Sequence, residues 1–273
     1  MDDRSPPDRY RIVEVVGRDG LATTYRAVDE RTNTAVAVKV VPTPPPATPD
    51  HLAREFDIGS RLSHRNLVRY HVCFRTQDHV CLVTDLVEGE PLLQALVSGQ
   101  PGSLEGPAAR AFRELCDVID YLHRENLIHG NLTPDVILWS SSCTLKLIDL
   151  GHCEDRIAEQ AFPHDGFHGT PIHASPEHGK GRLVPESDYF AVGILLYEHL
   201  TRRNPLLPES PGPCFAEICA RIAKGVPTQS VAELARAPSQ LRYSIESLLS
   251  VPLEARRSGW KELRGFLAAR HPA

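Results

Sequence analysis

The stretch that decides the fold reads Ile-His-Gly-Asn-Leu-Thr-Pro-Asp-Val-Ile-Leu and spans residues 128–138. Before it, residues 107–126 carry apolar side chains at helical spacing, which predicts a helix with one buried face. After it, residues 136–139 and 145–148 are short apolar runs that we expect to form a pair of strands. The stretch therefore joins a helix to a strand pair, and its polar residues are candidates for chemistry.

The N-terminal part of the chain has the pattern of a β-sheet. Runs rich in β-branched residues are bounded by turn-forming residues, which predicts strands. A helix is expected at residues 51–62. The expected strands lie at residues 10–16, 23–28, 34–41, 68–75 and 80–86.

The C-terminal part has mainly helical patterns, with expected helices at residues 188–201, 214–224, 239–249 and 260–270. Gly89 and Pro91 break the pattern between the two parts. We therefore predict an α+β fold with two lobes. Residues 1–9 are an N-terminal tail, residues 10–87 a small β-rich N-lobe with one helix, and residues 88–273 a larger, mainly helical C-lobe.

Composition excludes several classes of partner. The net charge is −5, with 41% hydrophobic and 24% charged residues, so no basic surface points to nucleic acid or acidic membranes. The longest apolar run, Tyr189 to Tyr197, is too short to span a bilayer. The first ten residues are polar and do not resemble a signal peptide, so we expect a cytoplasmic location.

The order of elements and motifs resembles the eukaryotic-like serine/threonine protein kinases, especially the bacterial Hanks-type ones, over about residues 8–270. The match includes Lys39 at the end of Val-Ala-Val-Lys, Glu55 nine residues before His64, and Asp149 in Asp-Leu-Gly. The resemblance implies that Lys39 contacts ATP phosphates and pairs with Glu55, and that Asp149 is the one remaining Mg²⁺ ligand.

The resemblance also implies a nucleotide site, although its glycine-rich loop is degraded. Asp19 and Ala22 stand where kinases have the second and third glycines, and Asp19 would repel phosphate oxygens. The backbone of Asp85 and Val87 would meet the adenine ring. The full set of expected nucleotide-binding residues is Val16, Gly17, Gly20, Thr24, Ala37, Lys39, Glu55, Asp85, Val87, Leu138 and Asp149.

The stretch at 128–138 departs from the kinase pattern at each position that performs the transfer. Asn131 replaces the catalytic aspartate, and an amide cannot take a proton at neutral pH. Thr133 replaces a lysine, and Val136 replaces an asparagine that binds a second Mg²⁺. No catalytic residue of this loop is intact. The His-Gly-Asn triplet resembles that of the Janus kinase pseudokinase domains.

Control by loop phosphorylation is absent from the sequence as well. Gly130 replaces the arginine that would bind an activation-loop phosphate. No Ser, Thr or Tyr occurs between His152 and Gly169. Scaffold residues are kept, because the resemblance pairs Glu177 with Arg256. The chain therefore resembles a kinase scaffold without its switch.

Three hypotheses follow. The first, which we favour, is a pseudokinase that regulates or binds proteins, with an active kinase or a phosphoprotein as partner. It leaves ATP binding open and predicts weak or absent Mg²⁺ binding. The second is a divergent, low-activity serine/threonine kinase, in which Asp135 would be the nearest substitute base. The third is a scaffold that binds no nucleotide because its pocket is closed.

Overall fold

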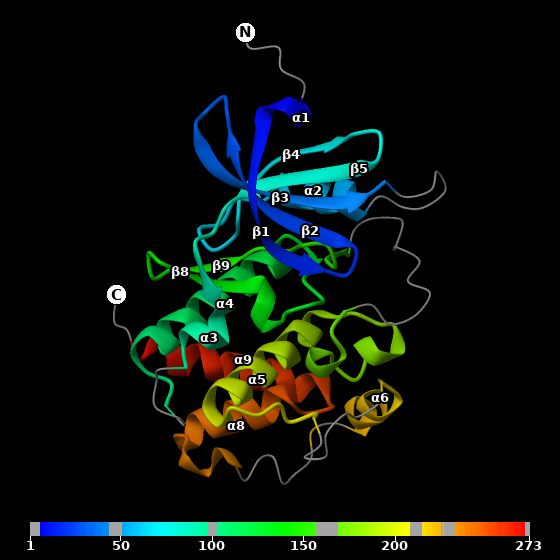
Figure 1. Ribbon diagram of the computed structural model, residues 1–273. Helices are drawn as coiled ribbons and strands as arrows, with labels where there is room; N and C mark the ends of the chain where they lie inside the picture. The colour runs from blue at the N-terminus through cyan, green and yellow to red at the C-terminus, as the bar shows by residue number, and fades with distance from the viewer. Residues whose placement is uncertain are drawn as a thin grey trace. The chain divides into compact units, whose positions relative to one another are not determined.

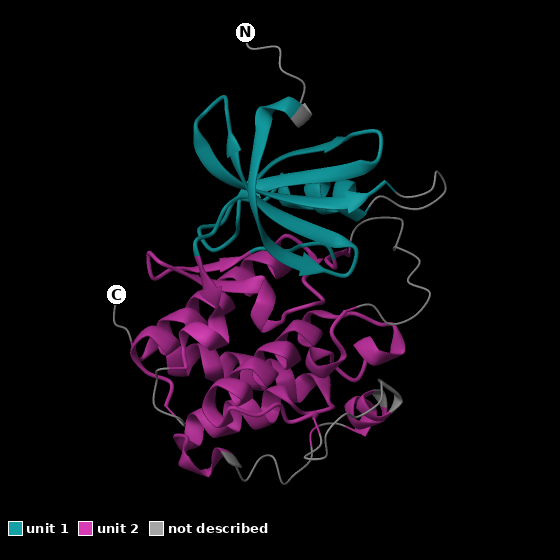
Figure 2. Cartoon of the chain, viewed as in Figure 1, with its two compact units in different colours: residues 1–88, 148–151 teal, residues 89–147, 152–273 magenta. Residues whose placement is uncertain are grey.

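The computed structural model describes residues 6–43, 51–97, 103–156, 169–207, 215–224, 226 and 233–270. The chain divides into two compact units (Figure 2). Unit 1 comprises residues 1–88 and 148–151, and unit 2 comprises residues 89–147 and 152–273. Of the expected tail, residues 1–5 lie outside the described residues, whereas Pro6–Arg9 form the short helix α1.

Unit 1 is a five-stranded antiparallel sheet with the strand order β1-β2-β3-β5-β4 (Figure 1). The helix α2 (His51–Gly59) packs against β4 and β5. Every strand predicted in this part is present. The bounds are β1 (Tyr10–Asp19), β2 (Ala22–Asp29), β3 (Thr34–Pro42), β4 (Tyr70–Arg75) and β5 (His79–Asp85).

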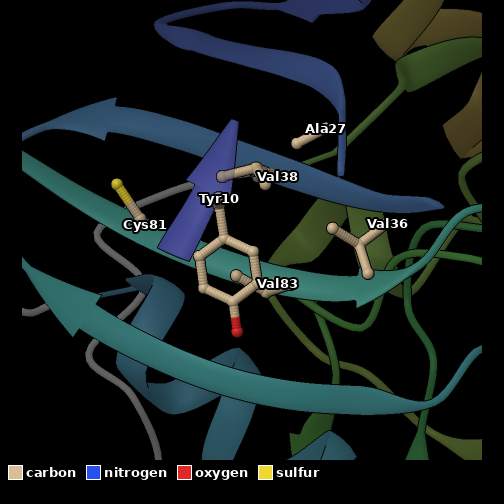
Figure 3. Packing of buried hydrophobic residues seen from close by; sticks show 6 residues of the cluster. All are labelled: Tyr10, Ala27, Val36, Val38, Cys81 and Val83. Atoms are coloured by element: carbon tan, nitrogen blue, oxygen red, sulfur yellow. The ribbon is translucent and has the colours of Figure 1, made fainter. Parts of the chain in front are cut away.

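The core of the sheet consists of small and β-branched side chains with one tyrosine. Tyr10 stacks on Phe74 with 6.0 Å between ring centroids. The strand β3 alternates, so Val36 and Val38 enter this core while Lys39 belongs to the opposite face. Figure 3 shows the buried cluster: Tyr10, Ala27, Val36, Val38, Cys81 and Val83.

Unit 2 opens with two small sheets. The strands β6 (Gly89–Pro91), β8 (Ile137–Ser140) and β9 (Leu145–Leu147) form one, and β7 (Leu127–Ile128) pairs with β10 (Glu154–Asp155) in the other. The break predicted at Gly89 and Pro91 is thus a short strand. A Cβ at residue 89 would lie 2.4 Å from the Trp139 carbonyl oxygen, so only glycine lets the strands pair here.

Helices make up most of the described part of unit 2 (Figure 1). The helix α5 is buried along most of its length and packs against α8 and α9. Short 3₁₀ turns lie at Pro134–Val136, Pro171–His173, His178–Lys180 and Glu233–Arg236. The α-helices are α3 (Leu92–Ala95), α4 (Gly106–Arg124), α5 (Pro185–Thr201), α6 (Phe215–Lys224), α8 (Ser239–Leu248) and α9 (Leu253–Ala268).

Two helices begin earlier than predicted. The helix α9 was expected from Trp260 and begins at Leu253, directly after Pro252. The helix α5 was expected from Asp188 and begins at Pro185, which occupies the first turn. Proline is favoured there because the first N–H groups of a helix have no partner within it. Apolar periodicity missed these turns because their residues are largely polar.

A buried ion pair holds the lower part of unit 2 together. The Arg256 guanidinium, fully buried, donates to Glu177 at 2.6 Å and to the carbonyl oxygen of Ser250 at 2.7 Å. Glu177 also accepts from the Ser187 hydroxyl at 2.7 Å. Burial alone would raise the pKa of Glu177, but the hydrogen bond and charge of Arg256, together with the hydroxyls of Ser175 and Ser187, outweigh burial and lower this pKa. The pairing implied by the resemblance is therefore present.

The α+β prediction is confirmed: one unit is mainly a sheet with one packed helix, and the other is mainly helical. Within the described residues, no helix has both the length and the apolar character that crossing a bilayer needs.

Candidate functional site

Unit 1 brings together three charged residues that lie far apart in the sequence. Lys39 comes from β3, Glu55 from α2, and Asp149 from the segment that follows β9. The Lys39 ammonium lies 3.0 Å from Glu55 and 3.1 Å from Asp149. The Glu55 side chain is only 2% exposed, so this network is a partly buried one.

The network shifts the pKa of its members. Burial alone would lower the pKa of Lys39, but the carboxylates of Asp149 and Glu55 outweigh burial and raise it. Burial and repulsion from Asp149 together raise the pKa of Glu55 to about 7, against the opposing effect of Lys39. Lys39 is therefore a cation at physiological pH, in position to contact an anionic ligand.

The surroundings of Asp149 bear on metal binding. Its Oδ1 accepts the Gly151 amide at 2.7 Å, while its Oδ2 faces Lys39. The second ligand position of a kinase is Val136, an aliphatic side chain that cannot bind a hard cation. In the described part of the chain, no group of three His, Cys, Asp or Glu residues is arranged to hold a metal ion.

The expected glycine-rich loop is a closed hairpin. Asp19 of β1 pairs with Ala22 of β2, leaving Gly20 and Leu21 as the two turn residues. Gly20 has φ +54° and no neighbour where a Cβ would lie, so its glycine serves the turn. The turn exposes 82% of Leu21. Gly17 lies on β1, three residues before this turn, and a Cβ there would lie 3.9 Å from the Thr24 side chain.

The other expected nucleotide residues lie mostly in unit 1. Ala37 neighbours Thr84 across the β3–β5 pair, and Asp85 ends β5. The Asp85 carbonyl oxygen, which would meet adenine, accepts the Thr84 hydroxyl at 3.3 Å. Val16 is half exposed on β1. Val87 is also in unit 1, whereas Leu138 is on β8 in unit 2.

The loop at 128–138 lies in unit 2 and is anchored by Asp188 of α5. Asp188 accepts the amides of His129 at 3.0 Å and Gly130 at 2.9 Å, and pairs with His123 at 2.7 Å. Burial would raise the pKa of Asp188, but the hydrogen bond and charge of His123, together with the charge of His129 and the amide of Gly130, outweigh burial and lower this pKa. The carboxylate thus fixes the backbone of the loop.

Asn131 has a structural contact in this loop. Its Oδ1 accepts the backbone N–H of Thr170 at 3.0 Å, which ties the loop to the segment before Pro171–His173. Thr133 is buried. Val136 ends the 3₁₀ turn that leads into β8. None of these three side chains can serve as a general base at neutral pH.

Gly130 is packed against a leucine. Its φ is +77°, and a Cβ there would lie 2.9 Å from Leu183 and 3.1 Å from the carbonyl oxygen of His152. Both the conformation and the space favour glycine at this position. Leu183 therefore leaves no room for the Cβ of a larger residue at position 130.

Sequence reasoning missed two partners of the site residues. One is Tyr70, whose hydroxyl donates to Glu55 at 3.0 Å, and the other is the amide of Thr170. No motif marked either of them. Gly59, in α2, could have predicted a side chain packed closely against this helix, because a glycine within a helix often leaves room for a neighbouring side chain.

A small antiparallel sheet with a Lys–Glu–Asp network, together with a helical unit whose loop is held by a buried aspartate, defines the architecture of a protein kinase. The model of the protein kinase domain family matches residues 10–264. The chain belongs to this family. Two-lobed kinase architecture is thus established by both fold and sequence.

Similar proteins are named as protein kinases, among them CBL-interacting and calcium/calmodulin-dependent kinases. A rice (Oryza sativa subsp. japonica) sequence named as a CBL-interacting protein kinase is 31% identical over 206 residues, 72% of this chain and 50% of the relative. Calcium/calmodulin-dependent protein kinase type II of Caenorhabditis elegans is 30% identical over 219 residues, 78% of this chain and 30% of the relative. The alpha chain of calcium/calmodulin-dependent protein kinase type II from Drosophila melanogaster is 30% identical over 220 residues, 78% of this chain and 41% of the relative. The chain spans half or less of the length of these relatives.

Proposed function

We propose that this chain is a pseudokinase of the eukaryotic-like, bacterial Hanks-type serine/threonine group, acting as a regulatory or protein-interaction module. The observation that carries the proposal is Asn131. It stands at the position of the catalytic base, and its oxygen accepts the Thr170 amide. A neutral amide cannot accept the proton of a substrate hydroxyl.

The neighbouring substitutions support the same reading. Thr133 is buried and carries no charge for a γ-phosphate, and Val136 has no oxygen for a metal. Removal of one stabilising donor in an active site typically costs about 10²–10³ in rate. Three such losses in one loop leave little transfer, even though they do not combine additively.

Nucleotide binding is the second part of the proposal. Lys39 is held as a cation by Glu55 and Asp149, and this arrangement suits contact with the phosphates of ATP. Gly17, Gly20 and the hinge backbone of Asp85 would complete the site. If ATP binds, it would supply a phosphoryl group, but the loop at residues 128–138 has no base to accept the proton of a substrate hydroxyl. We propose that binding is weakly dependent on Mg²⁺ or independent of it.

A protein partner follows from the family, because protein kinase domains act on or together with other proteins. Without a catalytic base, the remaining use of such a scaffold is recognition. We propose an active kinase or a phosphoprotein as the partner, by analogy with other pseudokinases.

A divergent, low-activity kinase is the second candidate. It is favoured by the intact geometry of Lys39, Glu55 and Asp149, which active kinases require. The relatives are also named as kinases. Asp135, the nearest substitute base, is exposed at the start of the 3₁₀ turn.

The test combines a thermal-shift titration with a transfer assay. Purified protein is titrated with ATP in EDTA, Mg²⁺ or Mn²⁺, and phosphate transfer to generic protein substrates is followed in parallel. A ligand at 100-fold its Kd adds about 2.7 kcal/mol of stability, so a clear rise in Tm is expected, with little metal dependence. Transfer that Lys39→Ala abolishes would establish the second candidate instead. No shift in any condition would support the closed scaffold.

A further inference from the structure

Tyr70, the first residue of β4, contributes a hydroxyl to the Lys39–Glu55–Asp149 network. Its side chain is buried, and the hydroxyl donates to Glu55 Oε1 at 3.0 Å. The other carboxylate oxygen of Glu55, Oε2, faces Lys39 at 3.0 Å. The glutamate is thus held from two sides, by a cation on β3 and by a phenol on β4.

Gly59 makes this contact possible. It is the last residue of α2, four positions after Glu55, so both lie on one face of the helix. A Cβ at residue 59 would lie 2.4–2.6 Å from three atoms of the Tyr70 ring. The φ of Gly59 is not left-handed, so glycine is present there for space and not for backbone conformation.

We propose that Tyr70 is a positioning residue that fixes α2 with Glu55 directed at Lys39. In kinases, the placement of this helix is controlled through phosphorylation of the activation loop. This chain has no Ser, Thr or Tyr between His152 and Gly169 that could be phosphorylated. The Tyr70 contact therefore holds α2 in place permanently, where a kinase would depend on a phosphorylated activation loop. The inference rests on the proposed nucleotide site only for its effect on affinity, because the contact itself needs no ligand.

Hydrogen exchange of α2 in the ligand-free protein tests the contact directly. Tyr70→Phe removes only the hydroxyl and should make the amides of residues 51–59 exchange about tenfold faster, the scale of one hydrogen bond to a carboxylate. Tyr10→Phe is the matched control, because Tyr10 is an equally buried tyrosine of the same unit that packs in the sheet core. Unchanged exchange of α2 in Tyr70→Phe would overturn the proposal.

A second pair of variants separates positioning from general loss of structure. Gly59→Ala should displace the Tyr70 ring and also speed the exchange of α2. In a Tyr70→Ala background the added methyl has room, so Gly59→Ala should then slow exchange, because alanine favours a helix over glycine. The sign of the Gly59→Ala effect should therefore reverse. The same sign in both backgrounds would count against the contact, and exchange of α5 in unit 2 monitors global unfolding.

Nucleotide affinity supplies the last readout. Tyr70→Phe should weaken ATP binding several-fold, and in a Glu55→Ala background it should have no further effect. If the wild-type protein binds no ATP, the proposed nucleotide site fails while the exchange results still decide the role of Tyr70. If wild-type and Tyr70→Phe proteins bind ATP equally and α2 exchanges alike in both, the positioning role fails and the nucleotide site stands.

Discussion

Replacing Lys39 by methionine should destabilise the protein in a pH-dependent way. Methionine keeps most of the aliphatic stem and removes the charge, so Glu55 and Asp149 lose the cation that lies 3.0 and 3.1 Å from them. Removing one partner of a buried pair costs about 3–5 kcal/mol. Two effects reduce the expected loss of stability to about 2 kcal/mol near pH 8. Solvent screens the Lys39 charge, because its side chain is 23% exposed, and Glu55 can take up a proton when the cation is gone.

The sign of the pH dependence follows from Glu55. Its pKa is raised by folding to about 7, so its stabilising contribution is present at low pH and is lost as the pH rises through that value. Without Lys39, nothing on β3 favours the carboxylate, and the pKa of Glu55 rises further. The destabilisation by Lys39→Met should therefore be larger near pH 8 than near pH 5.5.

Urea unfolding followed by circular dichroism at both pH values measures this difference. Lys261→Met is the matched control, because Lys261 is exposed on α9 and its replacement should change stability by less than about 0.5 kcal/mol. A loss of stability by Lys39→Met that is equal at the two pH values, or larger at the lower one, would refute the charge network described above.

Three further predictions concern unit 2. Arg256→Met should lower the free energy of unfolding in urea by about 3 kcal/mol or more. The wild-type protein should lose stability as the pH falls through the lowered pKa of Glu177, and Arg256→Met should remove that acid-dependent loss. Asn131→Ala should lose about 1 kcal/mol of stability because a backbone amide loses its acceptor, whereas Asn131→Asp should not, and neither should show phosphate transfer in a radiolabel assay. Gly130→Arg should destabilise by about 2 kcal/mol in the same unfolding assay, and adding Leu183→Ala should recover part of that, since both the φ of +77° and the leucine oppose a side chain there.

Much of the fold could be predicted because local patterns and tertiary structure agree. The β-branched run at residues 34–41 was predicted to be a strand, and in the structure it is β3, with Val36 and Val38 in the core and Lys39 on the other face. The helix α9 was predicted only from Trp260 because its first two turns are polar and show no apolar repeat. The strand β6 was missed because glycine and proline ordinarily interrupt a strand.

The candidate site also has features that could be predicted from the sequence and features that could not. The pairing of Lys39 with Glu55 was implied by the resemblance to protein kinases, and the structure brings Asp149 to the same ammonium. The contacts of Tyr70 and of the Thr170 amide could not be predicted. Each depends on two segments meeting in space, and a single sequence gives no pattern for such a meeting.

The leucine packed against Gly130 constrains the order in which this loop could change during evolution. With Leu183 in place, a mutation that restores arginine at residue 130 is harmful by itself, because a Cβ would lie 2.9 Å from the leucine. With glycine in place, losing Leu183 removes an apolar contact and restores no function. The cost of a side chain at residue 130 therefore depends on the residue at 183, so the two sites are epistatic. Return to a phosphate-responsive loop would therefore require changes at both residues together with a new phosphate acceptor, since no Ser, Thr or Tyr lies between His152 and Gly169.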